Sequence, residues 1–243
     1  AALEATRRLA PGEMLAGLLD LVANAHTPEE KELARLAAIA AATRVADRNA
    51  AATTVAERLK TWPTPERGIL LDMLRAIGGA QSLELVAVAA QAPERDTQDH
   101  ATRVLGAWPT SDAAPVLLNL ANSNHPFSAR ALRGYLRIAR QLNVGEEERI
   151  AMCRRALEIA NRDDARLLAL SILELSPSKT SLELAASQLA SDKLGPQASE
   201  AVINIAEAVA AGDPGAAQAA ARQVVEVGAG DEVLARAHKL AAP

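Results

Sequence analysis

Aromatic side chains are scarce in this sequence, where two Trp, one Tyr and one Phe make up 2% of 243 residues. A core without aromatics is filled by small aliphatic side chains, which suits thin stacked layers better than one thick core. The residue types that strands favour are not enriched either. Alanine is very common, followed by Leu, Arg and Glu, all of which favour helix. The composition therefore predicts an all-α protein.

Cysteine, long apolar runs and excess positive charge are also lacking. The single cysteine, Cys153, excludes an intrachain disulfide and a multi-cysteine metal site. No apolar run reaches the roughly 18 residues that span a bilayer, so we expect no membrane insertion. No signal peptide is visible and the chain starts at Ala1, which we interpret as a processed chain or an excised piece. A net charge of −4 makes nucleic-acid binding an unfavoured prediction.

Capping and breaking residues mark the expected helix ends. Thr27, with Pro28 and Glu30 after it, predicts a helix start, as do Thr64-Pro65, Asp112 and Asp213-Pro214. Thr180 to Glu183 has the spacing of a capping box. Gly78-Gly79, Gly195, Gly212 and Gly228 are expected at helix C-termini. Together these signals predict helices at 12–24, 28–46, 49–60, 65–77, 81–91, 96–107, 112–122, 127–142, 146–160, 163–175, 179–190, 197–211, 214–227 and 231–241.

Every second helix repeats one apolar stripe. A step of 31 residues relates Leu70 to Ala101 and Leu132, and the same step extends the alignment to Met73, Leu74 and Ile77 and their equivalents up to Tyr135, Leu136 and Ala139. A step of 36 then predicts Leu168, Ser171, Ile172 and Leu175, and a step of 34 predicts Val202, Ile205, Ala206 and Val209. Short links favour antiparallel neighbours. We therefore expect about seven antiparallel helix pairs in a single repeat domain, 1–243, with 1–24 and 212–243 as candidate caps.

Three stretches, 70–79, 101–109 and 131–139, resemble second helices of bacterial HEAT-like repeats. The last is similar to HEAT modules appended to larger extracytoplasmic proteins, often beside predicted sugar-active domains. The resemblance covers roughly 49–211. It implies a right-handed α-α superhelix, a HEAT-like solenoid, and an extracytoplasmic location. A tetratricopeptide array has a similar period, but its signature Trp, Leu-Gly, Tyr and Ala positions do not recur here.

Residues with catalytic potential are isolated. The four histidines do not pair at helical spacing and none forms the His-Glu dyad of HEAT-like di-iron hydroxylases. Cys153 is expected in an apolar layer, where a thiol is inert. Glu146–Glu148 and Asp163-Asp164 are interpreted as charges at helix N-termini. Trp62, Trp108 and Tyr135 are interpreted as packing residues. We predict no catalytic residue, cofactor or metal site.

The most pointed feature is a row of arginines, Arg130, Arg133, Arg137 and Arg140. They span roughly 80° of one helix, beside its apolar stripe. With Arg103 on an earlier helix, and Arg75 as an extension, they are the candidate binding residues of a concave groove. A guanidinium donates in a planar fork to carboxylates or phosphates, so a partner's acidic loop would suit the row. The alternative is a solvated face whose arginines pair with Glu146–Glu148, Asp163 and Asp164.

Three functions remain open. The first is a non-catalytic, monomeric scaffold that binds a protein partner or a neighbouring domain of the same polypeptide. The second is a HEAT-like enzyme, such as an alkyl-base DNA glycosylase or a bilin lyase. The glycosylase needs a basic groove, exposed aromatics and a catalytic carboxylate together, and only the arginine row supports it. The third is a structural spacer within a larger chain.

Overall fold

The computed structural model describes residues 11–191 and 194–242, and within these residues the chain is all-helical, with no strand. The prediction of an all-α protein is confirmed. Contacts divide the chain into two compact units, Ala1–Val116 and Leu117–Pro243, with the boundary inside α8 (Ala114–Ala121). Whether 1–243 forms a single repeat domain with caps at 1–24 and 212–243 stays a prediction, and residues 1–10 lie outside those described.

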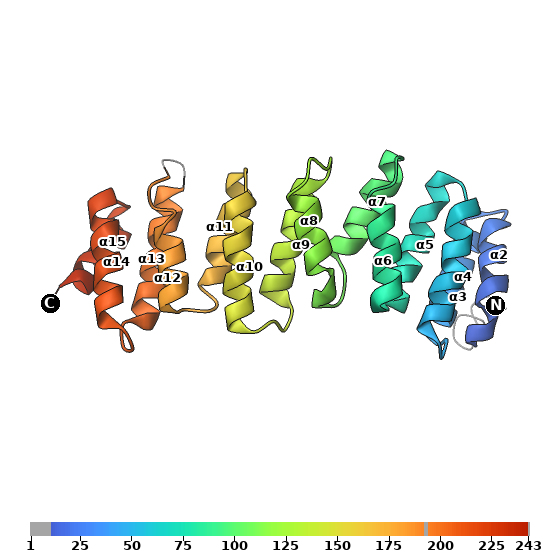
Figure 1. The fold of residues 1–243 in the computed structure, drawn as a ribbon, viewed down its shortest axis with the longest axis horizontal. Helices are drawn as coiled ribbons and strands as arrows, with labels where there is room; N and C mark the ends of the chain where they lie inside the picture. The colour runs from blue at the N-terminus through green and yellow to red at the C-terminus, as the bar shows by residue number, and fades with distance from the viewer. Residues whose placement is uncertain (1–10, 192–193, 243) are drawn as a thin grey trace. The chain divides into compact units, whose positions relative to one another are not determined.

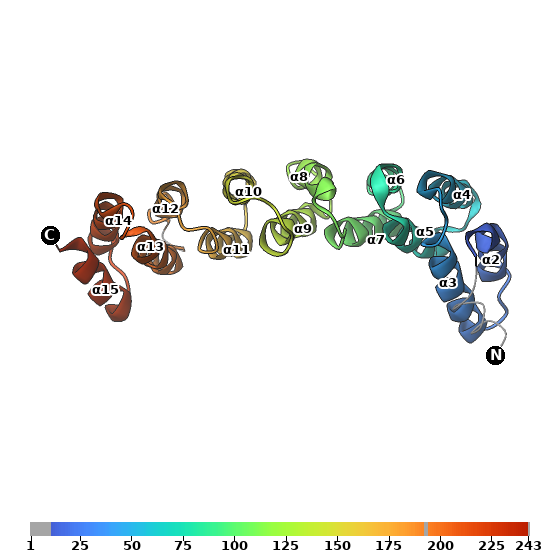
Figure 2. The same cartoon turned by 90° about the horizontal axis from the view of Figure 1, so that it is seen from below.

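The first unit contains two layers of packed helices (Figures 1 and 2). Its helices are α2 (Leu15–Ala23), α3 (Pro28–Ala42), α4 (Arg48–Thr61), α5 (Thr64–Ile77), α6 (Gly79–Ala89) and α7 (Arg95–Gly106), with short 3-10 helices at Gly12–Met14 and Ser111–Ala113. Consecutive helices α2 and α3, α4 and α5, and α6 and α7 pack together. In addition, α4 packs on α6 in one layer, while α5 packs on α3 and α7 in the other. Each helix thus contacts its neighbour in sequence and its counterpart one repeat away.

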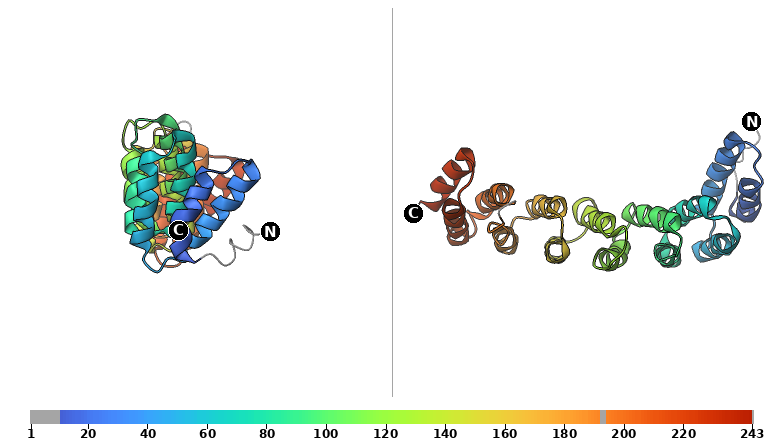
Figure 3. Two further views of the ribbon diagram at one scale, coloured as in Figure 1. Left: turned by 90° about the vertical axis from the view of Figure 1, so that its right-hand side faces the viewer. Right: turned by 90° about the horizontal axis from the view of Figure 1, so that it is seen from above.

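The second unit has the same arrangement, visible in the right-hand view of Figure 3. Its helices are α9 (Ser128–Gln141), α10 (Glu146–Ile159), α11 (Asp163–Leu173), α12 (Lys179–Ala186), α13 (Gly195–Val209), α14 (Pro214–Val227) and α15 (Asp231–Ala241). The first layer contains α10, α12 and α14, and the second contains α9, α11, α13 and α15. We call α3, α5, α7, α9, α11, α13 and α15 the second helices, and the even-numbered ones the first helices.

Four of the predicted caps are present, at Thr27, Asp213, Gly78 and Gly228. The Thr27 hydroxyl accepts from the Glu30 amide at 3.1 Å, and the Asp213 carboxylate accepts from the Ala216 amide at 2.9 Å. Gly78 and Gly228 end their helices with φ of 68° and 84°, values that residues other than glycine rarely adopt.

Other cap predictions are wrong. Thr64 and Asp112 lie inside the helices that they were expected to open, and the N-caps are Pro63 and Thr110. Ser178, not Thr180, caps α12, because Ser178 is extended and exchanges hydrogen bonds with Ser181, at 3.1 Å and 2.7 Å, while Thr180 already lies within the helix. Gly195 opens α13 instead of closing the preceding helix.

The apolar stripes of α5, α7 and α9 are buried as predicted, from Leu70 to Ala139, and Trp108 and Tyr135 are fully buried core residues. Trp62 is buried as well.

The 36-residue step is wrong for α11. Ser171 is exposed and Leu175 is 53% exposed, whereas Ala169, Leu170, Ile172 and Leu173 are buried. Ile172 and Leu173 take the places of Tyr135 and Leu136, a step of 37 residues, although α11 begins at Asp163 as predicted. On α13, Val202, Ile205 and Ala206 are buried as predicted, and Val209 is half-buried.

Candidate functional site

The arginine row lies on α9, whose other side forms core. Ala131, Leu132, Tyr135 and Ile138 are buried, while Arg133 and Arg140 are exposed and Arg130 and Arg137 are half-buried. The helix carries four arginines and no acidic residue. The four predicted residues therefore share one helix side. Arg103 lies on α7 of the first unit, where its guanidinium pairs with Asp99 of the same helix at 2.6 Å.

Arg133 is not a bare charge. Its guanidinium pairs with Asp164 in the first turn of α11, and Arg162 binds the same carboxylate at 3.1 Å. Hydrogen bonds from Arg162 and then Arg133 hold the pKa of Asp164 well below its usual range. The pairing expected under the solvated-face alternative is thus present for Arg133.

The other arginines of the row have different surroundings. The guanidinium carbon of Arg130 lies 4.7 Å from the centre of the Phe127 ring, a cation–π contact. Desolvation lowers the pKa of Arg137, which is half-buried. Arg140, in the last turn of α9, is exposed. The arginines of the row therefore differ in their contacts: Arg133 is held in an ion pair, whereas Arg140 is exposed at the end of the helix.

Polar bridges link successive second helices in the first unit. Lys31 of α3 binds Glu66 of α5 at 2.7 Å, and Asp72 of α5 lies 3.3 Å from Nε2 of His100 on α7. Gly68 makes room for that imidazole, because a Cβ there would lie 2.7 Å from His100 Nδ1. His100 is therefore an interhelix packing residue.

The second unit continues this pattern beyond the Arg133–Asp164 pair. Glu174, the C-cap of α11, accepts from Asn204 of α13 at 2.9 Å, and Asn204 accepts from Arg236 of α15 at 2.8 Å. Arg236 also forms a bidentate ion pair with Glu207, with hydrogen bonds of 2.7 Å and 3.0 Å. Sequence reasoning missed these bridges, because partners some 30 residues apart are matched by the stacking and not by local spacing.

A second recurring contact is a hydrogen bond from a helix side chain to the link that precedes the helix. Arg67, Gln98 and Arg166 are each the fourth residue of a second helix, α5, α7 and α11. Their side chains donate to carbonyl oxygens of the link just before the helix, at Trp62 (3.1 Å), Ala92 (2.7 Å) and Ala160 (3.0 Å). A long donor at that fixed position is a signal that could have been found in the sequence.

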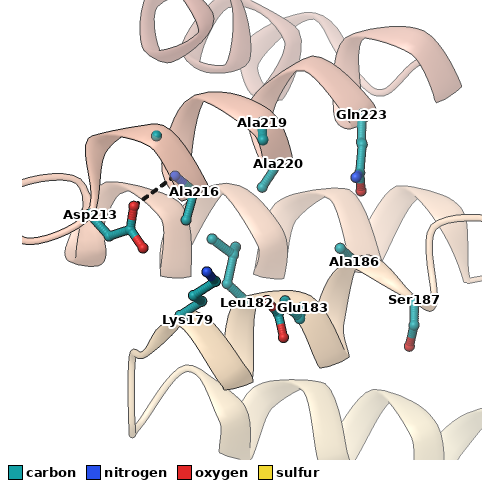
Figure 4. Close-up of a pocket in the computed structure, with 11 residues that line it drawn as sticks. Lys179, Leu182, Glu183, Ala186, Ser187, Asp213, Ala216, Ala219, Ala220 and Gln223 are labelled. Carbon is teal, nitrogen blue, oxygen red and sulfur yellow. Dashed lines mark hydrogen bonds between the residues drawn. The ribbon is translucent and has the colours of Figure 1, made fainter.

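Each unit also has a groove between two of its first helices. The groove between α12 and α14 has a volume of about 610 Å³ and is drawn in Figure 4. Leu182 and Ala220 contribute apolar surface, while Lys179, Glu183 and Asp213 supply charge at one end. The Asp213 carboxylate already accepts the capping hydrogen bond from the Ala216 amide. This groove is therefore walled mainly by small residues with polar ends.

The groove between α4 and α6 has a volume of about 630 Å³ and is more apolar. Ala56 and Leu59 line it from α4, and Leu85, Val88 and Ala89 line it from α6. Neither groove was predicted from the sequence, because each forms only when two first helices pack side by side.

Groups with catalytic potential are dispersed. Within the described residues, no three His, Cys, Asp or Glu side chains gather as metal ligands, and no helix is both long and apolar enough to cross a membrane. Burial raises the pKa of Cys153 to about 12, so its thiol stays protonated at neutral pH. The ring of His125 accepts from the Phe127 amide at 3.2 Å, a local turn contact.

No protein-family profile, curated protein or solved structure matches the chain.

Proposed function

We propose that this chain is a non-catalytic helical-repeat module that binds a partner protein or a neighbouring domain of its own polypeptide. In this proposal it is a HEAT-like, right-handed superhelix of about seven antiparallel helix pairs. The recurring stripes, the short links and the two-layer packing within each unit support that architecture. Repeat stacks of this kind use the surface of one helix layer for binding.

The observation that carries the proposal is the charge of α9. Four arginines share one side of a helix without an acidic residue, in a chain whose net charge is −4. Asp164 neutralises part of this charge in its ion pair with Arg133, and Arg140 stays exposed at the end of the row. Arginine forks recognise carboxylates well, so an acidic segment of a partner is the expected ligand.

The test is a capture experiment with matched charge variants. The chain, an Arg133→Glu/Arg137→Glu variant and an Arg154→Glu/Arg222→Glu control are immobilised, and native extracts are passed over each. The control makes the same charge change on first helices α10 and α14, at exposed positions. We expect a protein that is retained by the chain and the control and lost by the α9 variant. Equal retention by all three would refute the α9 site.

A second candidate, a structural spacer, is favoured by one observation. Arg133, Glu207 and Arg236 form ion pairs between second helices, so their charges hold neighbouring helices together and are not left open to a partner. A spacer predicts that none of the three immobilised proteins retains a partner and that both double variants remain folded by circular dichroism.

A further inference from the structure

The groove between α4 and α6 has features that its own unit does not explain. Helix α6 carries a single charged residue, Glu84, and is apolar on two sides. One side, with Leu83 and Val86, is buried in the core. The other, with Leu85, Val88 and Ala89, faces the groove, and Val88 is 67% exposed. A helix that is apolar nearly all round is normally covered on both sides.

The groove wall also includes a buried threonine. Thr97, in the first turn of α7, lines the groove and is only 4% exposed. Its Oγ1 is enclosed by the protein and has no hydrogen-bond partner among the described residues. The groove therefore presents no hydroxyl to a ligand at this position, and its wall there is apolar.

Three charged residues line the groove. Lys60, in the last turn of α4, is exposed, and Arg67 forms an ion pair with Glu94 at 3.2 Å. The lining thus has two cations and one carboxylate, and the carboxylate is paired with Arg67. A ligand carboxylate beside an apolar stripe would complement the remaining positive charge at Lys60.

We propose that this groove binds a short amphipathic helix of a partner protein, with an aliphatic stripe on α6 and a carboxylate at Lys60. Two packed helices, α4 and α6, form walls of the kind that accept a third helix. The volume of about 630 Å³ lies within the range of ligand sites and holds several aliphatic side chains. The site rests on the proposed partner-binding function but lies on the first helices α4 and α6, whereas the arginine row lies on the second helix α9.

The test uses a defined probe. An Ala-rich peptide of about 15 residues populates a helix in water, and leucines at i, i+4 and i+7 with glutamates beside them supply the stripe and charge. The peptide is titrated into the ¹⁵N-labelled full chain. We expect amide shifts centred on Leu59, Val88 and Thr97.

Three variants sharpen the result. Val88→Glu should weaken the peptide's affinity by about tenfold or more, and Lys60→Glu by about threefold. Leu175→Glu, the same change at an exposed leucine of the second unit, should leave it unchanged.

Other outcomes separate the alternatives. Equal affinity for Val88→Glu, or shifts centred elsewhere, would overturn the proposal. A concentration-dependent dimer by sedimentation that Val88→Glu dissociates would assign the groove to a second copy of the chain instead. The capture experiment run with Val88→Glu distinguishes the two proposals. A partner kept by Val88→Glu and lost by the α9 variant leaves the proposed function standing without the groove.

Discussion

At the residue scale, Gly68 is placed by its neighbour and not by its own backbone. A Cβ at this position would lie 2.7–2.8 Å from two ring atoms of His100. Alanine alone would favour the helix by roughly 0.5–1 kcal/mol, while crowding a packed site costs about 1–3 kcal/mol. We expect Gly68→Ala to destabilise the chain by about 1 kcal/mol in urea unfolding.

The double-mutant cycle with His100→Ala checks the cause. In that background the crowding is gone, and we expect Gly68→Ala to stabilise by about 0.5 kcal/mol. A loss of stability in both backgrounds would show that the imidazole is not what requires glycine.

Asp164 is the residue whose pairing has a pH signature. Its pKa is lowered in the folded chain by Arg162 and Arg133, so its contribution to stability is complete above the unfolded value of 3.8 and is lost as the pH falls below it. We expect Asp164→Asn to lower the Tm at pH 7. The gap from the parent should close well below pH 3.8. Asp163→Asn, the matched neighbour, should show a smaller gap, and a gap for Asp164→Asn that persists in acid would contradict the ion-pair explanation.

The sequence predicted which residues are buried better than which residues meet. Trp108 and Tyr135 follow from a stripe that each helix carries in itself. The contacts of Gly68 with His100 and of Arg133 with Asp164 depend on how far one layer is shifted along the next. That shift comes from packing across some 30 residues, for which local spacing holds no information.

At the element scale, α11 tests the corrected register. Leu173 is fully buried and Leu175 is 53% exposed, although the 36-residue step predicted Leu175 as core. We expect Leu173→Ala to cost about 2–5 kcal/mol and Leu175→Ala no more than about 0.5 kcal/mol in urea unfolding. Similar costs for both would restore the predicted register.

Helices were predicted more securely than the joints between them. All fourteen expected helices have a counterpart. The errors fall at helix ends, where Ser178 replaced Thr180, and in the register of the buried stripe of α11. A helix interior repeats its signal every turn, whereas a link offers one or two candidate residues. The grooves were missed for a related reason, since a groove such as that lined by Val88 and Leu59 exists only after two helices pack.

At the scale of the whole molecule, stability should be local. In a repeat array each element is held by its neighbours, so a core defect spreads to adjoining helices first. Helix α5 contacts α3, α4, α6 and α7. We expect Leu74→Ala, at a fully buried position of α5, to accelerate hydrogen exchange in these helices and to leave α13–α15 unchanged.

Leu173→Ala in α11 supplies the reciprocal experiment. It should accelerate exchange in α9, α10, α12 and α13, the helices that α11 contacts, while α2–α5 keep the exchange rates of the parent chain. Both variants remove the same atoms from fully buried leucines, so only their place in the array differs. Uniform acceleration by either variant would mean that the 243 residues unfold as one cooperative body, and the nearest-neighbour description of the stack would then be wrong.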